Sequence, residues 1–118
     1  MSVHMDGARF ANAAIAAGAS PAELTWKSGV DVLSFGVIKN GGMNAEAVVF
    51  FDPDRVGDFE FRRKRAGQLA CKGRYAAVQL SSYVESGLWQ RNAERANRLA
   101  ARIAAAAPEL LSVPFATN

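Results

Sequence analysis

Two short apolar runs joined by a glycine-rich loop constrain the fold of this chain more than any other feature. The runs are Val30–Phe35 (VDVLSF) and Ala47–Phe51 (AVVFF), and the loop 36–42 (GVIKNGG) carries the turn residues Asn-Gly-Gly. Two strands so close in sequence are expected to pair in antiparallel fashion. The second run is continuously apolar, which predicts a strand buried on both faces.

An extended segment and two helices are expected before the first run. The extended segment is Val3–Met5, and the alanine-rich stretch Ala8–Ala17 is predicted to be a helix with Gly18 as its C-cap. Ser20 is followed by a proline and, two residues later, by Glu23. This pattern predicts a capped start for a second, short helix.

Two long helices are expected after the second run. Asp54 is predicted to cap the first, which carries a basic cluster from Arg62 to Arg74. The second, Leu88–Ala107, has alanines at helical spacing that predict a core-facing seam, and Pro108 follows it. Together with a strand candidate at 110–115, this order of elements predicts an α/β fold.

Composition limits the classes of protein. The chain has 118 residues, half of them hydrophobic, which suits one domain with a packed core and is too short for a two-domain enzyme. The net charge is +3, and no aromatic residue lies within the basic cluster, so a solvated helix face is favoured over nucleic-acid binding. A small basic binding protein remains an alternative.

Other compositional signals are weak. The single cysteine, Cys71, cannot form an internal disulfide and is expected to be buried. There is no metal-ligand spacing and no apolar run long enough for a membrane span. We expect a cytoplasmic protein that binds neither membrane nor metal.

Two residues are candidates for chemistry. Asp6 follows the first extended segment, and acids at strand ends lie where α/β sheets bind ligands. The alternative is that Asp6 only caps the helix that starts at Ala8. Lys39 is the single lysine of the glycine-rich loop, and a lysine against apolar walls is a usable nucleophile for a carbonyl. The alternative is an ordinary exposed loop lysine.

Four stretches together resemble the low-specificity threonine aldolases, pyridoxal-phosphate enzymes of the aspartate-aminotransferase fold. They are HMDGARFANA, SPAELTWKSGVDVLSFGVIKNGGMNAEAVVFFDP, RRKRAGQLACKGR and GLWQRNAERAN, and they cover nearly the whole chain in the family's order. The resemblance implies that residues 1–118 are a single incomplete domain, part of the large cofactor-binding domain and truncated at both ends. Residues 88–118 would lead into the small domain.

The resemblance also implies roles for four residues. Asp6 pairs with the pyridine nitrogen of the cofactor, and Arg9 of the same motif lies near its phenolic oxygen and the substrate carboxylate. Lys39 forms the internal aldimine with pyridoxal 5'-phosphate. Lys64 stands where the family has a basic residue that reaches toward the active site of a neighbouring subunit, which implies a homo-oligomer.

The implied reaction is the reversible retro-aldol cleavage of a β-hydroxy-α-amino acid to glycine and an aldehyde. Ile38 departs from the family, which has Thr or Ser there to help hold the phosphate. The family's phosphate turn, its stacking histidine and a second arginine for the substrate carboxylate are not among these 118 residues. His4 is instead expected to lie beside Asp6 on the same side of a strand.

These departures predict weak or no cofactor binding by this chain alone. They also leave open an alternative function. The chain would then be a truncated, catalytically inactive remnant that associates with itself through uncovered sheet edges and apolar faces.

Overall fold

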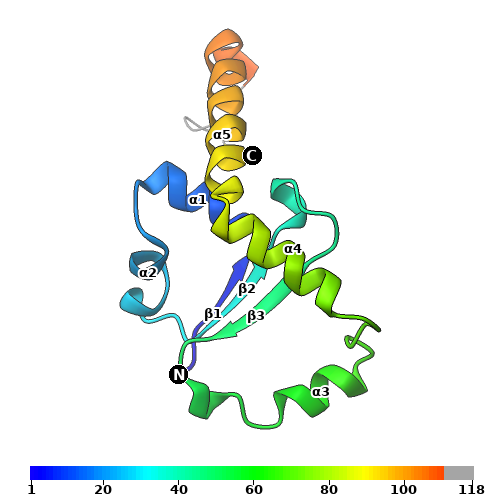
Figure 1. Ribbon diagram of the computed structural model, residues 1–118. Coiled ribbons are helices and arrows are strands. Elements are labelled where there is room, and N and C mark those ends of the chain that lie inside the picture. The colour runs from blue at the N-terminus through cyan, green and yellow to red at the C-terminus, as the bar shows by residue number, and fades with distance from the viewer. Residues whose placement is uncertain (111–118) are drawn as a thin grey trace.

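The structure is a computed structural model that describes residues 1–110. A three-stranded sheet forms its centre, with β1 (His4–Gly7), β2 (Val32–Gly36) and β3 (Glu46–Phe50) in that spatial order (Figure 1). The helices are α1 (Phe10–Ala17), α2 (Pro21–Leu24), α3 (Phe59–Arg65), α4 (Arg74–Glu85) and α5 (Leu88–Ala106). Short 3₁₀ turns are η1 (Trp26–Ser28), η2 (Ile38–Asn40), η3 (Pro53–Arg55) and η4 (Pro108–Leu110). The described chain is therefore a mixed α/β unit, as the element order predicts.

The sheet combines one parallel and one antiparallel pair. β1 runs parallel to β2 with Asp6 opposite Ser34, and β2 runs antiparallel to β3 with Phe35 opposite Ala47. The antiparallel pairing across the glycine-rich loop is thus confirmed. β1 continues through Gly7, two residues further than the sequence predicts, because it pairs with β2 along that length.

One face of the sheet is covered by helices. Phe35 lies at its centre, with its ring centroid 6.1 Å from that of Phe10 in α1 and 6.3 Å from that of Tyr83 in α4. Both helices therefore pack on the same face, and α5 continues from α4 and projects away from the sheet (Figure 1). The other sheet side chains that pack in this core are Met5, Leu33 and Val49.

The opposite face is largely exposed. Alternate strand residues point to it, among them His4 and Asp6, which are both exposed. Val48 is 43% exposed, so the prediction that the second apolar run is buried on both faces is wrong for the described chain. The helices leave this face open except where Phe59 of α3 contacts Phe50, with ring centroids 5.1 Å apart.

The prediction that a single helix carries the basic cluster is wrong. α3 ends at Arg65 and α4 begins at Arg74, and Lys72 between them has φ 59. Gly67 has φ 73, a left-handed conformation that interrupts a helix. Arg65 and Lys72 therefore share no helix face, and Asp54 lies in η3 rather than at a helix N-cap.

Two burial predictions also need correction. Cys71 is exposed rather than buried, because it lies in the segment between α3 and α4. In the alanine seam of α5, Ala93 is fully buried, but Ile103 is 71% exposed because the second half of the helix projects beyond the sheet.

The local predictions for the other helices are confirmed. α1 ends at Gly18 with φ 60, although it begins two residues later than expected. Ser20 and Glu23 form the predicted capping box, and hydrogen bonds from the Ser20 hydroxyl and backbone lower the pKa of the Glu23 carboxyl. α5 ends within one residue of its predicted end. The strand candidate at 110–115 lies almost wholly outside the described residues.

Candidate functional site

Three of the four predicted site residues follow the same edge of the sheet. β1 and β2 are parallel, so their carboxyl ends lie at one edge. Asp6 is the next-to-last residue of β1, and Arg9 lies two residues after that strand ends. Lys39 lies in η2, which follows β2. Lys64 lies in α3, which Figure 1 places at the other end of the strands. The fold therefore groups Asp6, Arg9 and Lys39 and leaves Lys64 apart.

Asp6 does not cap the following helix. Its Oδ1 accepts a hydrogen bond from the Ala8 backbone N–H at 2.9 Å and so closes the turn between β1 and α1. The helix begins later, at Phe10, with Arg9 as the residue before it. Within residues 1–110 the second carboxylate oxygen, Oδ2, has no hydrogen-bond partner, so it is available to a ligand.

His4 lies on the same sheet face as Asp6, as the alternation of strand residues predicts. Its Nε2 lies 2.8 Å from the Ser34 hydroxyl, and Ser34 is the residue of β2 directly opposite Asp6. Sequence analysis missed Ser34, because its place beside Asp6 depends on the register between two strands. The two hydrogen-bonding side chains form a polar strip next to the acid.

Lys39 is exposed at the tip of η2. Its neighbour Ile38 is 50% exposed, so the apolar walls expected around the lysine are not supplied by residues 1–110. The residues on either side of these two are buried, with Val37 at 0% and Asn40 at 7% exposure. The amine is thus accessible while the backbone that carries it is fixed.

The fixed backbone depends on residues that sequence analysis missed. The Asn40 side-chain amide donates to the Trp89 carbonyl at 2.8 Å and to the Tyr83 hydroxyl. The Asn92 side-chain amide donates to the Asn40 carbonyl at 2.9 Å. Burial raises the pKa of the Tyr83 phenol, and the hydrogen bond from Asn40 opposes that shift. These partners lie on α4 and α5, more than forty residues along the chain, and no local pattern reveals them.

The side chains of Asp6, Arg9 and Lys39 at this edge suit a cofactor with an aldehyde and a ring nitrogen. An amine can hold an aldehyde, a carboxylate can hold a protonated ring nitrogen, and a guanidinium can bind an anionic oxygen. Ile38 offers no hydroxyl for a phosphate. The residues therefore fit the reactive parts of pyridoxal phosphate and lack one phosphate contact.

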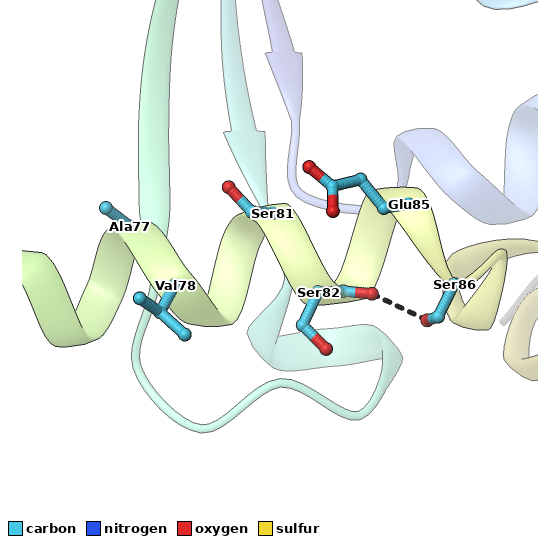
Figure 2. Close-up of a pocket in the computed structure, with 6 residues that line it drawn as sticks. All are labelled: Ala77, Val78, Ser81, Ser82, Glu85 and Ser86. Atoms are coloured by element: carbon cyan, nitrogen blue, oxygen red, sulfur yellow. Dashed lines mark hydrogen bonds between the residues drawn. The ribbon is translucent and has the colours of Figure 1, made fainter.

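One hollow of the described surface lies along α4 and includes none of the four predicted site residues. Its volume is about 530 Å³, and its lining side chains are spread over both sides of that helix (Figure 2). Its lining residues are Ala77, Val78, Ser81, Ser82, Glu85 and Ser86. We therefore assign it no role in the chemistry.

Residues 1–110 contain neither a candidate metal site nor a candidate membrane-spanning helix. No three His, Cys, Asp or Glu side chains in this part of the chain are grouped so that they could hold a metal ion. Among the same residues, no helix combines the length and the apolar character needed to cross a membrane.

Comparison with known proteins identifies the family. The sequence model of the beta-eliminating lyases matches residues 1–117. A low specificity L-threonine aldolase of Pseudomonas aeruginosa is 51% identical over 102 residues, which are 86% of this chain and 30% of that protein. The enzyme of the same name from another Pseudomonas strain is 49% identical over 100 residues, 85% of this chain and 29% of its own length. The chain thus spans less than a third of these relatives, and it belongs to the beta-eliminating lyase family.

Proposed function

We propose that this chain forms the cofactor-binding part of a threonine-aldolase-type lyase. The reaction would be the reversible cleavage of a β-hydroxy-α-amino acid to glycine and an aldehyde, with pyridoxal 5'-phosphate as cofactor. The single observation that carries the proposal is the shared sheet edge, where Asp6 of β1 and Lys39 after β2 both present exposed side chains. The identity of about half the residues to two threonine aldolases supports the same reaction class.

Each residue has a defined task in this proposal. When bound, pyridoxal phosphate supplies a protonated ring that accepts the electron pair released when the substrate Cα–Cβ bond breaks. Lys39 Nζ holds the aldehyde carbon of the cofactor. Asp6 Oδ2 keeps the proton on the ring nitrogen, because an ionised carboxylate stabilises a neighbouring cation. Arg9 binds the carboxylate of the amino-acid substrate.

Lys64 lies away from the other three site residues. It is exposed on α3, at the end of the sheet opposite the edge that carries Lys39. A lysine in that position is better placed to serve the site of a second copy than the site of its own chain. This position supports the proposal that the functional protein is a homo-oligomer.

A cofactor titration tests the proposal. Pyridoxal phosphate is added to the wild-type chain and to Lys39→Ala and Lys27→Ala, and the cofactor absorbance is followed. Lys27 is exposed and has no role in the proposal. We expect weak but saturable binding to the wild type and to Lys27→Ala, and no saturable binding to Lys39→Ala. The same unsaturable response in all three proteins would contradict the proposal.

The open face of the sheet favours a second candidate, a non-catalytic chain that associates with itself. Val48 in the middle of β3 is 43% exposed on this face, which leaves apolar surface for a partner. Sedimentation at several concentrations, with Val48→Lys as the variant, tests association through this face. Association that Val48→Lys abolishes, combined with no saturable cofactor binding, would favour this second candidate.

A further inference from the structure

The loop that carries Lys39, residues 37–45, is called the lysine turn below. Two backbone hydrogen bonds of this turn share one acceptor. The Asn40 and Gly42 N–H groups both donate to the Val37 carbonyl, at 3.1 and 2.8 Å. The Val37 N–H donates in turn to the Ala45 carbonyl at 3.3 Å. Both Val37 and Ala45 are fully buried. The turn is therefore a closed unit whose two ends lie in the core.

Asn40 joins this unit to the helices through both its side chain and its backbone. Its amide nitrogen, Nδ2, donates to the Trp89 carbonyl at 2.8 Å and to the Tyr83 hydroxyl, and its own carbonyl accepts from Asn92 Nδ2 at 2.9 Å. Asn40 is the residue directly after the candidate nucleophile. Because its polar groups are buried, any movement that breaks these bonds leaves them without partners, which is unfavourable.

Two further contacts restrict the turn. Gln79 of α4 accepts hydrogen bonds from the backbone N–H groups of Met43 and Asn44, at 2.7 and 3.4 Å. Asn92 also packs directly against the turn, since a Cβ on Gly41 would lie 2.5 Å from Asn92 Nδ2. The turn is thus bounded on more than one side by α4 and α5, and its lysine has little freedom to change its starting direction.

We propose that Asn40 and Asn92 are positioning residues that fix the direction in which Lys39 leaves the sheet edge. Neither side chain acts as a nucleophile or as a general acid in this proposal. Their hydrogen bonds act by holding the backbone of the turn in place. The inference rests on the proposed function of Lys39 and adds the residues that orient it. It also means that the direction of the Lys39 side chain depends on the position of α5, because Asn92 belongs to that helix.

The same helix offers a matched control. The Asn97 side chain donates to the Asn12 backbone carbonyl at 3.0 Å and accepts from the Asn12 amide at 3.2 Å. This bridge ties α5 to α1, and Asn12 is buried like Asn40. Asn92 and Asn97 thus donate the same kind of hydrogen bond from one helix, Asn92 to the lysine turn and Asn97 to α1.

Hydrogen exchange of the full chain tests the positioning role directly. The variants are Asn92→Ala and Asn92→Asp, of which the second keeps the side-chain volume and removes the donor. We expect exchange of the Asn40 and Gly42 amides to become about tenfold faster in both variants. The matched variants Asn97→Ala and Asn97→Asp should change these amides less than about twofold. Equal effects from the two positions, or no effect from Asn92, would overturn the inference.

Trapping of pyridoxal phosphate with borohydride separates this inference from the proposed function. The share of label on Lys39, relative to Lys27, Lys64 and Lys72, is measured by peptide mapping. We expect that share to be high in the wild type and in Asn97→Asp, and to fall at least about threefold in Asn92→Asp. A high share retained in Asn92→Asp would overturn the positioning role alone. A wild type without preference for Lys39 would overturn the proposed function, and the positioning role with it.

Discussion

The lysine turn and the basic segment, residues 59–73, each carry a candidate site lysine, but the chain holds the two regions very differently. In the lysine turn, Val37, Asn40 and Ala45 are buried. In the basic segment α3 has no buried residue, and every residue from 60 to 75 is exposed. Both regions contain glycines and cationic side chains. Within residues 1–110, hydrogen bonds join the lysine turn to α4 and α5 at several points, whereas the basic segment has no such set of bonds to other elements.

The difference shows that turn chemistry alone does not place a functional residue. Asn-Gly-Gly predicts that the chain reverses near Lys39, and it does. The hydrogen bonds that hold the reversed chain come from Tyr83, Trp89 and Asn92, far along the sequence. In the described part of the chain, no such hydrogen bonds hold the backbone around Lys64, and α3 has no buried residue. The position of Lys64 in the functional protein therefore depends on what packs against α3.

Glycine substitutions should separate the two regions most clearly. A Cβ on Gly42 would lie 2.2 Å from Val37 Cγ2 and 3.0 Å from the Val37 carbonyl oxygen, whereas at Gly67 nothing lies within 4 Å. We expect Gly42→Ala to lower the free energy of unfolding by about 3 kcal/mol. Gly67→Ala should lower it by about 1 kcal/mol, from its left-handed backbone alone. Urea unfolding measures both, and equal losses would contradict the contrast.

Removing the Tyr83 hydroxyl should weaken the support of the lysine turn. Tyr83→Phe deprives the buried Asn40 amide of one acceptor, and we expect a loss of about 1 kcal/mol at neutral pH by urea unfolding. The exposed Tyr75 of the same helix is the matched control, and its replacement by Phe should cost less than about 0.5 kcal/mol.

The same variant should change how stability depends on pH. Burial raises the pKa of Tyr83 above its ordinary value of 10.0, so the folded chain holds this proton more tightly than the unfolded chain. The resulting stability is complete below the ordinary value and is lost as pH rises toward the higher folded value. The wild type should therefore lose more stability than Tyr83→Phe between about pH 9 and about pH 11. If the free energies of unfolding of the two proteins changed equally with pH over this range, the prediction would be refuted.

A hydroxyl at position 38 should strengthen cofactor binding. Ile38 is 50% exposed, so Ile38→Thr should have little effect on folding and should supply a donor for the phosphate. We expect pyridoxal phosphate affinity to rise about fivefold, about 1 kcal/mol. The control is Ile103→Thr, a residue that is 71% exposed in the half of α5 that projects beyond the sheet. Unchanged affinity in Ile38→Thr would mean that the phosphate does not approach this residue.

The ion pair of the basic segment should contribute least. Arg62 Nε lies 2.8 Å from Asp58 Oδ1, and the two side chains are 73% and 64% exposed. We expect Arg62→Ala to lower the free energy of unfolding by at most about 0.5 kcal/mol, and by less in high salt. A loss above about 1 kcal/mol would show that this segment is held more firmly than its exposure indicates.

Local patterns in the sequence predicted a large part of the fold. The capping box at Ser20 and Glu23, the C-cap at Gly18 and the antiparallel hairpin all depend on residues a few positions apart. The break between α3 and α4 could not be predicted in this way, because the segment reads as helical except at its glycines. Burial of the second apolar run was overestimated, since an apolar pattern does not say which face another element will cover.

The candidate site was predicted less completely than the fold. Asp6 and Lys39 were singled out by their chemistry, and the parallel pairing of β1 and β2 puts them at one edge. Ser34, Asn40 and Asn92 were missed, because each owes its place to a contact across the tertiary structure. Their side chains are common polar types, and only the fold distinguishes them from other surface polar residues.

The most direct test of the central claim, that Lys39 is the lysine placed to hold the cofactor, is the distribution of trapped label in the wild-type chain. Pyridoxal phosphate is added below saturation, borohydride fixes it, and peptide mapping assigns it to lysines. We expect most of the label on Lys39, with Lys27, Lys64 and Lys72 labelled only at the level of exposed surface amines. Label spread evenly over the four lysines would contradict the claim.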